Sequence, residues 1–380
     1  GIAKAYAGNV IDGAKVKYRV VRNVNYPNWY WWYRSYYGGT SETEITNGET
    51  VTNDTGAYVI KFKALPDESV SKESYATYNY QISADVTDIN GETHSTQTNI
   101  TIGYQSLQLN ISSYVILICT CLVGIWITHE SGKGYIIEIN NSKPIRILTT
   151  NLNGIDENTK GTFAIYKLKQ PQKIFRNRLW TQPDRHSLTK EEYYKTFPND
   201  LYADETNKYK WEKDSKVLDK TFDTGIKKEY DLSNELKSFT PGVYVIEANC
   251  KDKFGEEIKA FEYITLFDKN SNTIPEQVAE WFYYTKTKAE PGEKVSYILA
   301  SAYPNVNYLF EQEQAGKVAT VKTIAASMKS NDIQIEETHR GNFSFHTTFI
   351  KHNRIYTHNS IVTVPYTNKE LDIQFLIITH

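Results

Sequence analysis

Residues 242–248 read GVYVIEA, and the pattern set by this stretch occurs twice more in the chain. GAYVIKF occupies residues 56–62, and GNFSFHT occupies residues 341–347. Each copy has a Gly, one variable residue and an aromatic residue, followed by alternating side chains. This order indicates a turn and then a half-buried β-strand.

The residues after each copy predict a hairpin. Strand-like stretches flank Asn90-Gly91 within residues 80–102, and similar stretches turn near Phe254-Gly255 and near His352-Asn353-Arg354. The residues that open each unit alternate as well, in GAKVKYRVVR (13–22), KPIRILTTNL (143–152) and GEKVSYILASAY (292–303). The chain therefore repeats one plan three times.

We predict an all-β fold of three tandem antiparallel β-sandwich domains of the Ig/fibronectin-like kind. The expected domains span residues 1–103, 104–267 and 268–366, and residues 367–380 would begin a linker to a further domain. The joints fall near 103–110 and 267–275, where the second stretch is polar and contains a Pro.

The middle domain carries an insertion at about residues 169–235, rich in charge and Tyr. Its stretch SLTKEEYYKTFP (187–198) predicts one short helix, capped by Ser187 or Thr189 and ended by Pro198. An insertion of this length in a compact domain is commonly functional or faces a partner.

Composition excludes several classes of protein. The 380 residues include 45 acidic side chains and 43 Lys or Arg, so a net charge of -2 gives no long-range attraction to nucleic acid or to an anionic membrane. The three cysteines, Cys119, Cys121 and Cys250, are too few for a disulfide scaffold and are expected as small buried side chains.

The apolar run YVILICTCLVGIWIT (114–128) is shorter than the ~20 residues of a membrane-spanning helix. Its β-branched and aromatic residues favour one long buried strand, or two strands with a break at Gly124. The chain begins Gly-Ile-Ala without an initiator Met, and we interpret it as part of a longer protein.

YPNWYWWYRSYY (26–37) places eight aromatic residues in twelve positions. In an extended segment the aromatic side chains would point to both faces, so both faces need cover. We predict that this row contacts a neighbouring domain or a partner, through Trp29, Tyr30, Trp31, Trp32, Tyr33 and Tyr36. The alternative is a stacking platform for a glycan or peptide; stacking on nucleic acid would need a basic groove, which the sequence does not show.

Several stretches resemble the macroglobulin-like domains of bacterial alpha-2-macroglobulin family proteins. They include AYAGNVIDGAKVKYRVVR, WYWWYR, ETEITNGETVTNDTGAYVIKFKALPD and YNYQISADVTDINGETHSTQTNITIG, the insertion from Leu179 to Lys213, and the stretch TVPYTNKELDIQF (363–375). The order resembles the third to fifth such domains of a longer chain. Residues 112–137 and the last residues, LIITH, depart from the family pattern.

The resemblance implies a scaffold segment of a protease trap, in the periplasm or at the cell surface of a bacterium. Its partners would be other domains of the same parent chain and, through the whole parent, target proteases. The covalent thioester of some relatives needs a Cys and a Gln a few residues apart. FEQEQ (310–314) has no Cys nearby, and no Cys of this chain has a Gln at that spacing.

No catalytic motif, cofactor motif or metal motif is found, so we expect no enzyme activity and no cofactor. His346 and His358 would lie opposite each other if the last hairpin turns at 352–354, as a cross-strand pair without a metal. TNDTG (52–56) and DVTDING (85–91) are expected to be Asx turns and not calcium loops. The alternative function is a cell-surface binding or adhesion module of stacked Ig-like domains, with the aromatic row holding a glycan or protein. A membrane would be reached only through an anchor outside this segment.

Overall fold

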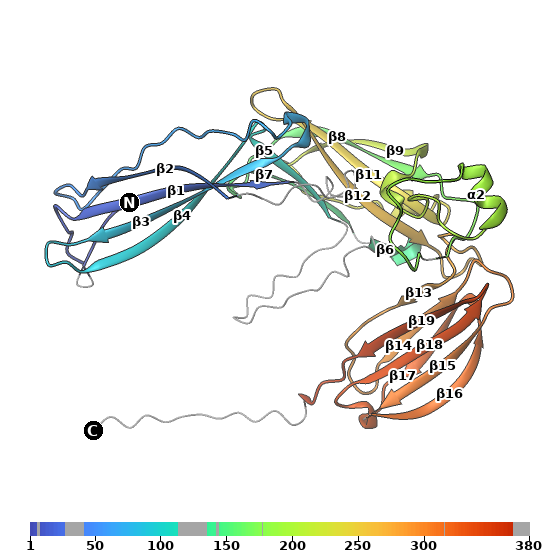
Figure 1. Ribbon diagram of the computed structural model, residues 1–380. Coiled ribbons are helices and arrows are strands. Elements are labelled where there is room, and N and C mark those ends of the chain that lie inside the picture. Colours follow the sequence, from blue (N-terminus) through green and yellow to red (C-terminus); the bar gives the residue numbers. More distant parts are fainter. Residues whose placement is uncertain are drawn as a thin grey trace, which may run out of the picture.

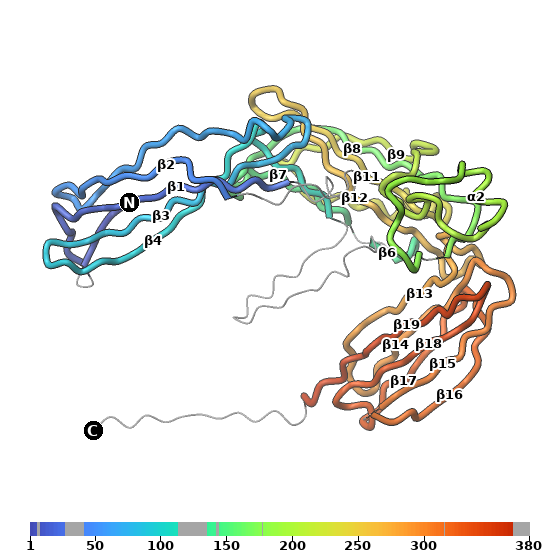
Figure 2. The backbone as a smooth tube through the Cα atoms, in the orientation of Figure 1, coloured from blue at the N-terminus to red at the C-terminus, as the bar shows by residue number. Residues whose placement is uncertain are grey.

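The computed structural model describes residues 1–5, 8–26, 42–112, 135–141, 144–176, 178–314 and 316–367. Figure 1 shows three β-rich bodies that follow one another in chain order along an arch, and Figure 2 shows the same backbone path without the ribbons. Nearly all strand pairs are antiparallel, which confirms the predicted all-β class of tandem sandwich domains.

The first domain is built on a four-stranded sheet in the order β2-β1-β3-β4. Its strands are β1 (Lys15–Asn25), β2 (Thr43–Val51), β3 (Thr77–Thr87) and β4 (Thr93–Gly103), with the 3₁₀ helix η1 (Lys72–Ser74) before β3. Alternate residues of β1 and β3 point to the core, among them Val20, Val24, Tyr78, Tyr80 and Ile82.

Residues 56–62 do not form the strand that the repeat predicts. The segment is extended and its side chains alternate in burial, but within the described part of the chain its only ladder contact is the bridge from Ala57 to Ile2. Residues 56–62 themselves are held by main-chain bonds to the start of the chain, since the amide of Tyr58 donates to the oxygen of Gly1 at 2.9 Å and the oxygen of Gly56 accepts from the amide of Ala3 at 2.8 Å. Just after this segment, Arg22 Nη1 and the Tyr80 hydroxyl both donate to the main-chain oxygen of Leu65, at 2.9 and 2.8 Å, and attach the chain to the sheet.

The second domain packs a three-stranded sheet, β10-β7-β5, against a five-stranded sheet, β6-β12-β11-β8-β9. The bounds are β5 (Leu107–Ser112), β6 (Tyr135–Glu138), β7 (Ile145–Asn151), β8 (Lys160–Leu168), β9 (Lys213–Asp223), β10 (Glu229–Tyr230), β11 (Gly242–Lys251) and β12 (Glu257–Phe267). The short helices are η2 (Ile139–Asn141) and α3 (Ser233–Leu236). Strand β6 pairs in parallel with β12, the one parallel strand pair among the described strands.

Phe163, Ile165, Tyr244 and Ile246 fill the space between the two sheets. Cys250 is buried beside them, as expected of a small apolar side chain, and burial raises the pKa of its thiol to about 11. Cys119, Cys121 and the apolar run 114–128 lie outside the described residues.

The insertion is the connection between β8 and β9. The amide of Lys169 donates to the oxygen of Glu212 at 2.9 Å and closes its neck, so residues 213–223, expected in the insertion, instead form the edge strand β9. The predicted helix is present as α2 (Lys190–Thr196), with Thr189 and Glu192 forming a reciprocal cap, and η3 (Lys208–Lys210) follows it.

The third domain packs the sheet β13-β14-β17 on the sheet β16-β15-β18-β19. Its elements are β13 (Trp281–Tyr284), β14 (Lys294–Ala300), β15 (Asn307–Gln314), β16 (Lys317–Ala325), β17 (Ser327–Gln334), η4 (Glu337–His339), β18 (Phe343–Lys351) and β19 (Arg354–Val362). Tyr297, Phe310 and Phe345 stack at its centre, with ring centroids 5.2–5.7 Å apart.

Within the residues that the structure describes, one kind of turn occurs four times, with an Asn or Asp first and a Gly three residues later. In the β3–β4 hairpin the Asp88 carboxylate accepts from the amides of Asn90 and Glu92, at 2.9 and 2.8 Å, and Gly91 takes a left-handed φ of +88°. The other copies start at Asn53, Asn151 and Asp252. Both TNDTG and DVTDING thus contain Asx turns, as predicted, because a short side-chain oxygen can satisfy two amides of a tight turn.

Candidate functional site: the joints between domains

The aromatic row was the candidate site in the sequence. Trp29, Tyr30, Trp31, Trp32, Tyr33 and Tyr36 lie outside the described residues, so its contacts remain a prediction. Tyr26, at the start of the row, is described and packs against the core of the first domain. Within the described chain, hydrogen bonds and ring contacts connect neighbouring domains at two joints.

The first joint is polar and uses two of the repeated turns. The Asp252 carboxylate accepts from both the amide and the hydroxyl of Ser106, each at 2.9 Å. Asn153 accepts from the amide of Thr101 at 3.1 Å, and the Gln105 side chain donates to the oxygen of Glu257 at 2.7 Å. Turns of the second domain are therefore hydrogen-bonded to the end of β4 and to the connector that follows it.

The two carboxylate oxygens of Asp252 bind different groups, one in its own turn and one across the joint. One oxygen accepts from the turn amides of Phe254 and Glu256, both at 2.9 Å, and the other accepts from Ser106. Burial opposes ionisation of this carboxyl, but the hydrogen bonds outweigh it and hold the pKa of Asp252 below its ordinary value. A charged acceptor with four donors is a firm attachment point.

The second joint has an apolar centre. Phe267 ends β12, and its ring lies 5.3 Å from that of Trp281 and 4.6 Å from that of Tyr283, both on β13. Ile298, Ala300 and Met328 from the third domain complete this cluster, and Ile136 of β6 packs against it. The side chain of Trp281 is only 4% exposed, so the cluster is a true interface core.

The insertion adds a second attachment across the same joint. The Gln170 side chain donates to the oxygen of Pro275 at 2.6 Å and accepts from the amide of Gln277 at 3.1 Å, and so holds the connector as a neighbouring strand would. Further along, Arg176 forms a two-bond ion pair with Asp200, at 2.6 and 2.7 Å. Its remaining nitrogen donates to the oxygen of His352, in the β18–β19 turn, at 2.9 Å.

The foot of the insertion rests on the five-stranded sheet. Trp211 packs beside Leu168, Val243 and Val245, and Tyr209 meets Tyr263 edge-on at 4.6 Å. Burial raises the pKa of the Glu262 carboxyl on β12 to about 8, against a counteracting effect of Lys208. Burial likewise lowers the pKa of Lys208. Two ionisable groups are thus partly withdrawn from water where the insertion meets the sheet.

A groove of about 480 Å³ opens between the neck and the helix of the insertion. Its charged side chains are paired with one another: Lys190 with Glu205 at 3.3 Å, and Lys169 with Glu212 at 3.2 Å. Lys173 lies over the ring of Tyr194, 4.8 Å from the centroid. These pairs neutralise the groove from within and connect its walls.

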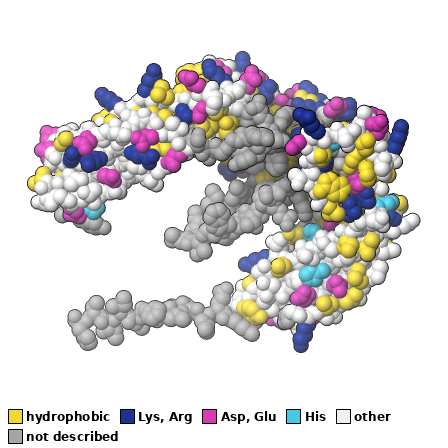
Figure 3. Space-filling model, in the orientation of Figure 1, with side chains coloured by type: hydrophobic (Ala, Val, Ile, Leu, Met, Phe, Trp, Pro, Cys, Tyr) yellow, Lys and Arg dark blue, Asp and Glu magenta, His cyan; other side chains and the backbone are white. Residues whose placement is uncertain are grey.

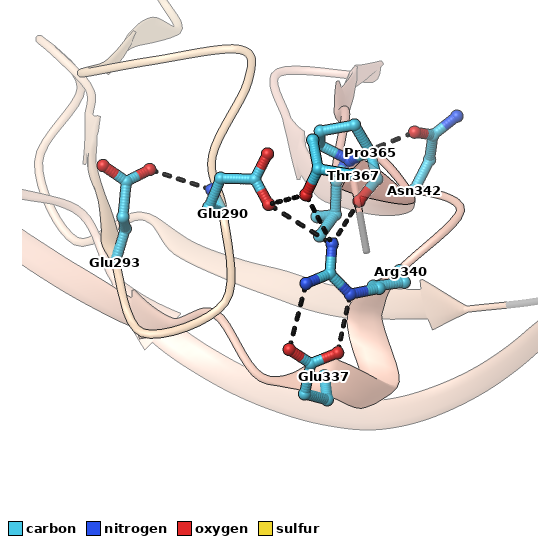
Figure 4. A network of polar contacts seen from close by, with 8 residues as sticks. Glu290, Glu293, Glu337, Arg340, Asn342, Pro365 and Thr367 are labelled. Atoms are coloured by element: carbon cyan, nitrogen blue, oxygen red, sulfur yellow. Dashed lines mark hydrogen bonds and ion pairs between the residues drawn. The ribbon is translucent and has the colours of Figure 1, made fainter. Parts of the chain in front are cut away.

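A polar network fixes the end of the third domain (Figure 4). Arg340 makes two bonds to Glu337, at 2.6 and 3.0 Å, and its other nitrogen reaches Glu290 at 3.2 Å and the oxygen of Pro365. The Thr367 hydroxyl donates to Glu290 at 3.1 Å. The segment that follows β19 is therefore tied to the loop before β14.

The two histidines of the last hairpin do not face each other, which corrects the prediction. The hairpin turns through two residues, His352 and Asn353, with φ of +47° and +56°, and this places His346 opposite Asn359. Because the register differs by one residue, the two rings lie on opposite faces of the sheet. His346 bonds Asn359 at 2.7 Å and Glu313 at 3.1 Å, whereas the ring of His358 lies 4.1 Å from that of Phe282.

The described residues contain no group of three or more His, Cys, Asp or Glu placed to hold a metal ion. None of the helices in that same part of the chain has the length and apolar character to cross a membrane. On the face that Figure 3 presents, basic and acidic side chains are intermixed and form no continuous area of one sign.

The joint residues had weak signals in the sequence. WFYY (281–284) is an aromatic run directly after the polar connector, comparable to the row at 26–37, and could have been found by the same reasoning. Gln170, Arg176 and Asp252 had no such signal, because their partners are distant in the sequence.

No family model matches the chain, and no curated protein matches it in sequence. Several solved structures align with the chain, all at low identity and low TM-scores. The native E. coli alpha-2-macroglobulin aligns over 95% of this chain at 10% identity and a TM-score of 0.32, and the trypsin-activated form over 94% at 10% identity and 0.30. This chain spans 21% and 22% of those two chains.

A tetra-tandem repeat from the extending region of a large adhesion protein also aligns, over 93% of this chain and 68% of that one, at 11% identity and a TM-score of 0.18. The resemblances to macroglobulin domains and to adhesion domains are both loose. The fold described above rests on the chain's own sheets and cores.

Proposed function

We propose that this chain is a non-enzymatic scaffold segment of an alpha-2-macroglobulin-like protease inhibitor that acts outside the bacterial cytoplasm. The sequence stretches named above support the family. The observation that carries the mechanical role is the insertion, which is rooted on the second domain and bound to the third. A segment whose insertion strengthens the joint between two domains is suited to fixing the angle between those domains and to transmitting a movement from one to the other.

The structure suggests how such a segment would work. Residues 169–212 make contact through Gln170 near the connector and through Arg176 at the far turn, so the second and third domains are held at two separated places. Two separated attachments resist rotation better than one. A displacement of the third domain would therefore pass to the second domain and not be absorbed at the joint.

The test uses the full natural polypeptide that contains these residues, mixed with a broad-specificity protease. A trap encloses the protease, so we expect cleavage of a large protein substrate to be lost while cleavage of a small chromogenic peptide continues. Arg176→Ala should weaken this size-selective inhibition, and Arg185→Ala, at an exposed position of the same insertion, should leave it unchanged.

Equal inhibition of both substrates, or no inhibition, would overturn the proposal. A glycan array probed with the 380-residue chain addresses the adhesion alternative. We expect no binding, and saturable binding to a defined glycan would favour the adhesion module.

A further inference from the structure

The free edge of β4 differs from the other long sheet edges of the described chain. Five edge strands have nine or more residues: β2, β4, β9, β16 and β19. Four of them carry Lys, Arg, Asp or Glu, which discourage pairing with another strand. The sequence of β4, THSTQTNITIG, has no such residue and no Pro.

The geometry of β4 is also suited to pairing. Its ladder with β3 runs without a bulge from Thr77–Gly103 to Thr87–Thr93, whereas the edge strands β2, β9 and β16 all have register breaks. Bulges twist an edge away from partners, and β4 lacks this protection. In Figure 1 it forms the lower border of the first domain.

The direction of the free hydrogen-bonding groups follows from one contact. The amide of Thr101 donates to Asn153 and so points away from β3. In an antiparallel ladder the outward amides recur at every second residue, so those of Ser95, Gln97 and Asn99 point the same way. This edge of the described chain therefore offers a short row of donors and acceptors, which ends where Asn153 covers Thr101.

The apolar side chains of β4 are incompletely covered. Ile100 and Ile102 lie opposite the buried Tyr80 and Tyr78 but are 37% and 38% exposed, because the core layer ends at this edge. A further strand beside β4 would extend that layer. Main-chain pairing and apolar cover thus favour the same partner, an extended strand.

We propose that this partner is β4 of a second copy, paired antiparallel about a two-fold axis. Such an arrangement matches the strand to itself, since antiparallel pairing sets its Thr, Ser, Gln and Asn side chains against one another and brings no like charges together. The pairing is short, so the dimer should be weak and visible only at high protein concentration.

The experiment is sedimentation velocity of the 380-residue chain from micromolar to submillimolar concentration. We expect a concentration-dependent dimer. The double variant Gln97→Lys with Asn99→Lys places four positive charges at the paired edge and should weaken the dimer by at least about tenfold. Asn47→Lys, on the opposite edge strand β2, adds charge to the same sheet and should have no effect.

A second variant covers the case in which the added lysines disturb the fold. Asn99→Pro removes one outward amide and, because that amide does not pair with β3, should leave the hairpin intact while weakening the dimer. A chain that stays monomeric throughout would overturn the proposal. So would a dimer that is unchanged by both edge variants, or one that Asn47→Lys weakens equally.

Discussion

The two joints both connect neighbouring domains, but the first does so mainly through hydrogen bonds and the second mainly through buried apolar side chains. At the first joint, the side chains of Asp252, Asn153 and Gln105 make hydrogen bonds across a short connector. At the second joint, the rings of Phe267 and Trp281 are packed away from water, and the insertion adds further bonds. Hydrogen bonds fix a direction but exchange readily with water, whereas a buried cluster gains stability in proportion to the area that it covers. We infer that the first joint can hinge and that the second is rigid.

Removal of the ring at the second joint should have the largest effect. Trp281→Ala deletes a side chain that is 4% exposed and leaves a cavity between two domains, so we expect a loss of about 3–5 kcal/mol in the free energy of unfolding. Urea denaturation measures the loss, and small-angle X-ray scattering should show a wider range of shapes.

Trp281→Phe is the matched control for this prediction. The indole nitrogen of Trp281 is buried without a hydrogen-bond partner in the described structure, so its removal costs little while a ring still fills the space. We expect Phe to retain most of the stability. If Ala and Phe destabilise equally, the cluster is not the source of rigidity.

A smaller effect is expected at the first joint. Asp252→Asn retains one oxygen for the turn amides but turns an amide group toward Ser106, so the joint bonds are lost while the turn remains. We expect a loss of about 1–3 kcal/mol, because a buried donor loses its charged acceptor. Asp88→Asn is the control, since Asp88 caps the same kind of turn and its hydrogen bonds in the described structure stay within the β3–β4 hairpin.

The pH dependence of this effect has a definite sign. The pKa of Asp252 is lowered in the folded chain, so the stabilisation by its carboxylate is present above the pKa of the unfolded chain. It is lost as the pH falls through the folded pKa. The difference between the Asp252→Asn variant and the original chain should therefore shrink in acid. An effect of Asp88→Asn as large as that of Asp252→Asn would show that the turn, and not the joint, is responsible.

Local signals allowed much of the fold to be predicted. Asn90-Gly91 and Phe254-Gly255 mark hairpins because these tight turns contain a residue with left-handed backbone angles, which Gly adopts at the lowest cost. Gly91 and Gly255 both have a positive φ in the structure. For the last hairpin, the predicted pairing of the two strands differs from the observed pairing by one residue. The turn contains no Gly, and two other residues, His352 and Asn353, adopt the left-handed conformation instead. Strand β9 is not recognisable as a strand of the sheet from its sequence, KDSKVLDKTFD, because most of its exposed positions are charged. An edge strand tolerates such charges, and the prediction therefore places these residues in the insertion.

The sites at the joints could not be predicted in the same way. Ser106 and Asp252 are 146 residues apart, and Arg176 and His352 are 176 residues apart. Each is an ordinary polar residue, and only the arrangement of the domains brings the partners together. The second joint was partly accessible, since the aromatic run at 281–284 stands next to a predicted connector.

The smallest expected effect concerns Glu262, beneath the insertion. Its pKa is about 8 in the folded chain, against 4.5 without the surrounding protein, because burial favours the neutral form. Between these two values the folded chain keeps a proton that the unfolded chain releases, so the free energy of unfolding should fall as the pH rises through this window. Glu262→Gln removes the titration and should flatten the decline. Because Glu262 is only partly buried and Lys208 opposes the shift, we expect about 1–2 kcal/mol between pH 5 and pH 8.

The matched variant is Glu256→Gln, at an exposed position in the β11–β12 turn, and it should leave the pH profile unchanged. Stability that is equally pH-dependent in the Glu262→Gln variant and in the original chain would show that water reaches this carboxylate. The foot of the insertion would then not be sealed against β12. In that case the rigidity of the second joint would rest on the Phe267–Trp281 cluster and on the hydrogen bonds of Gln170 and Arg176, without a sealed base beneath the insertion.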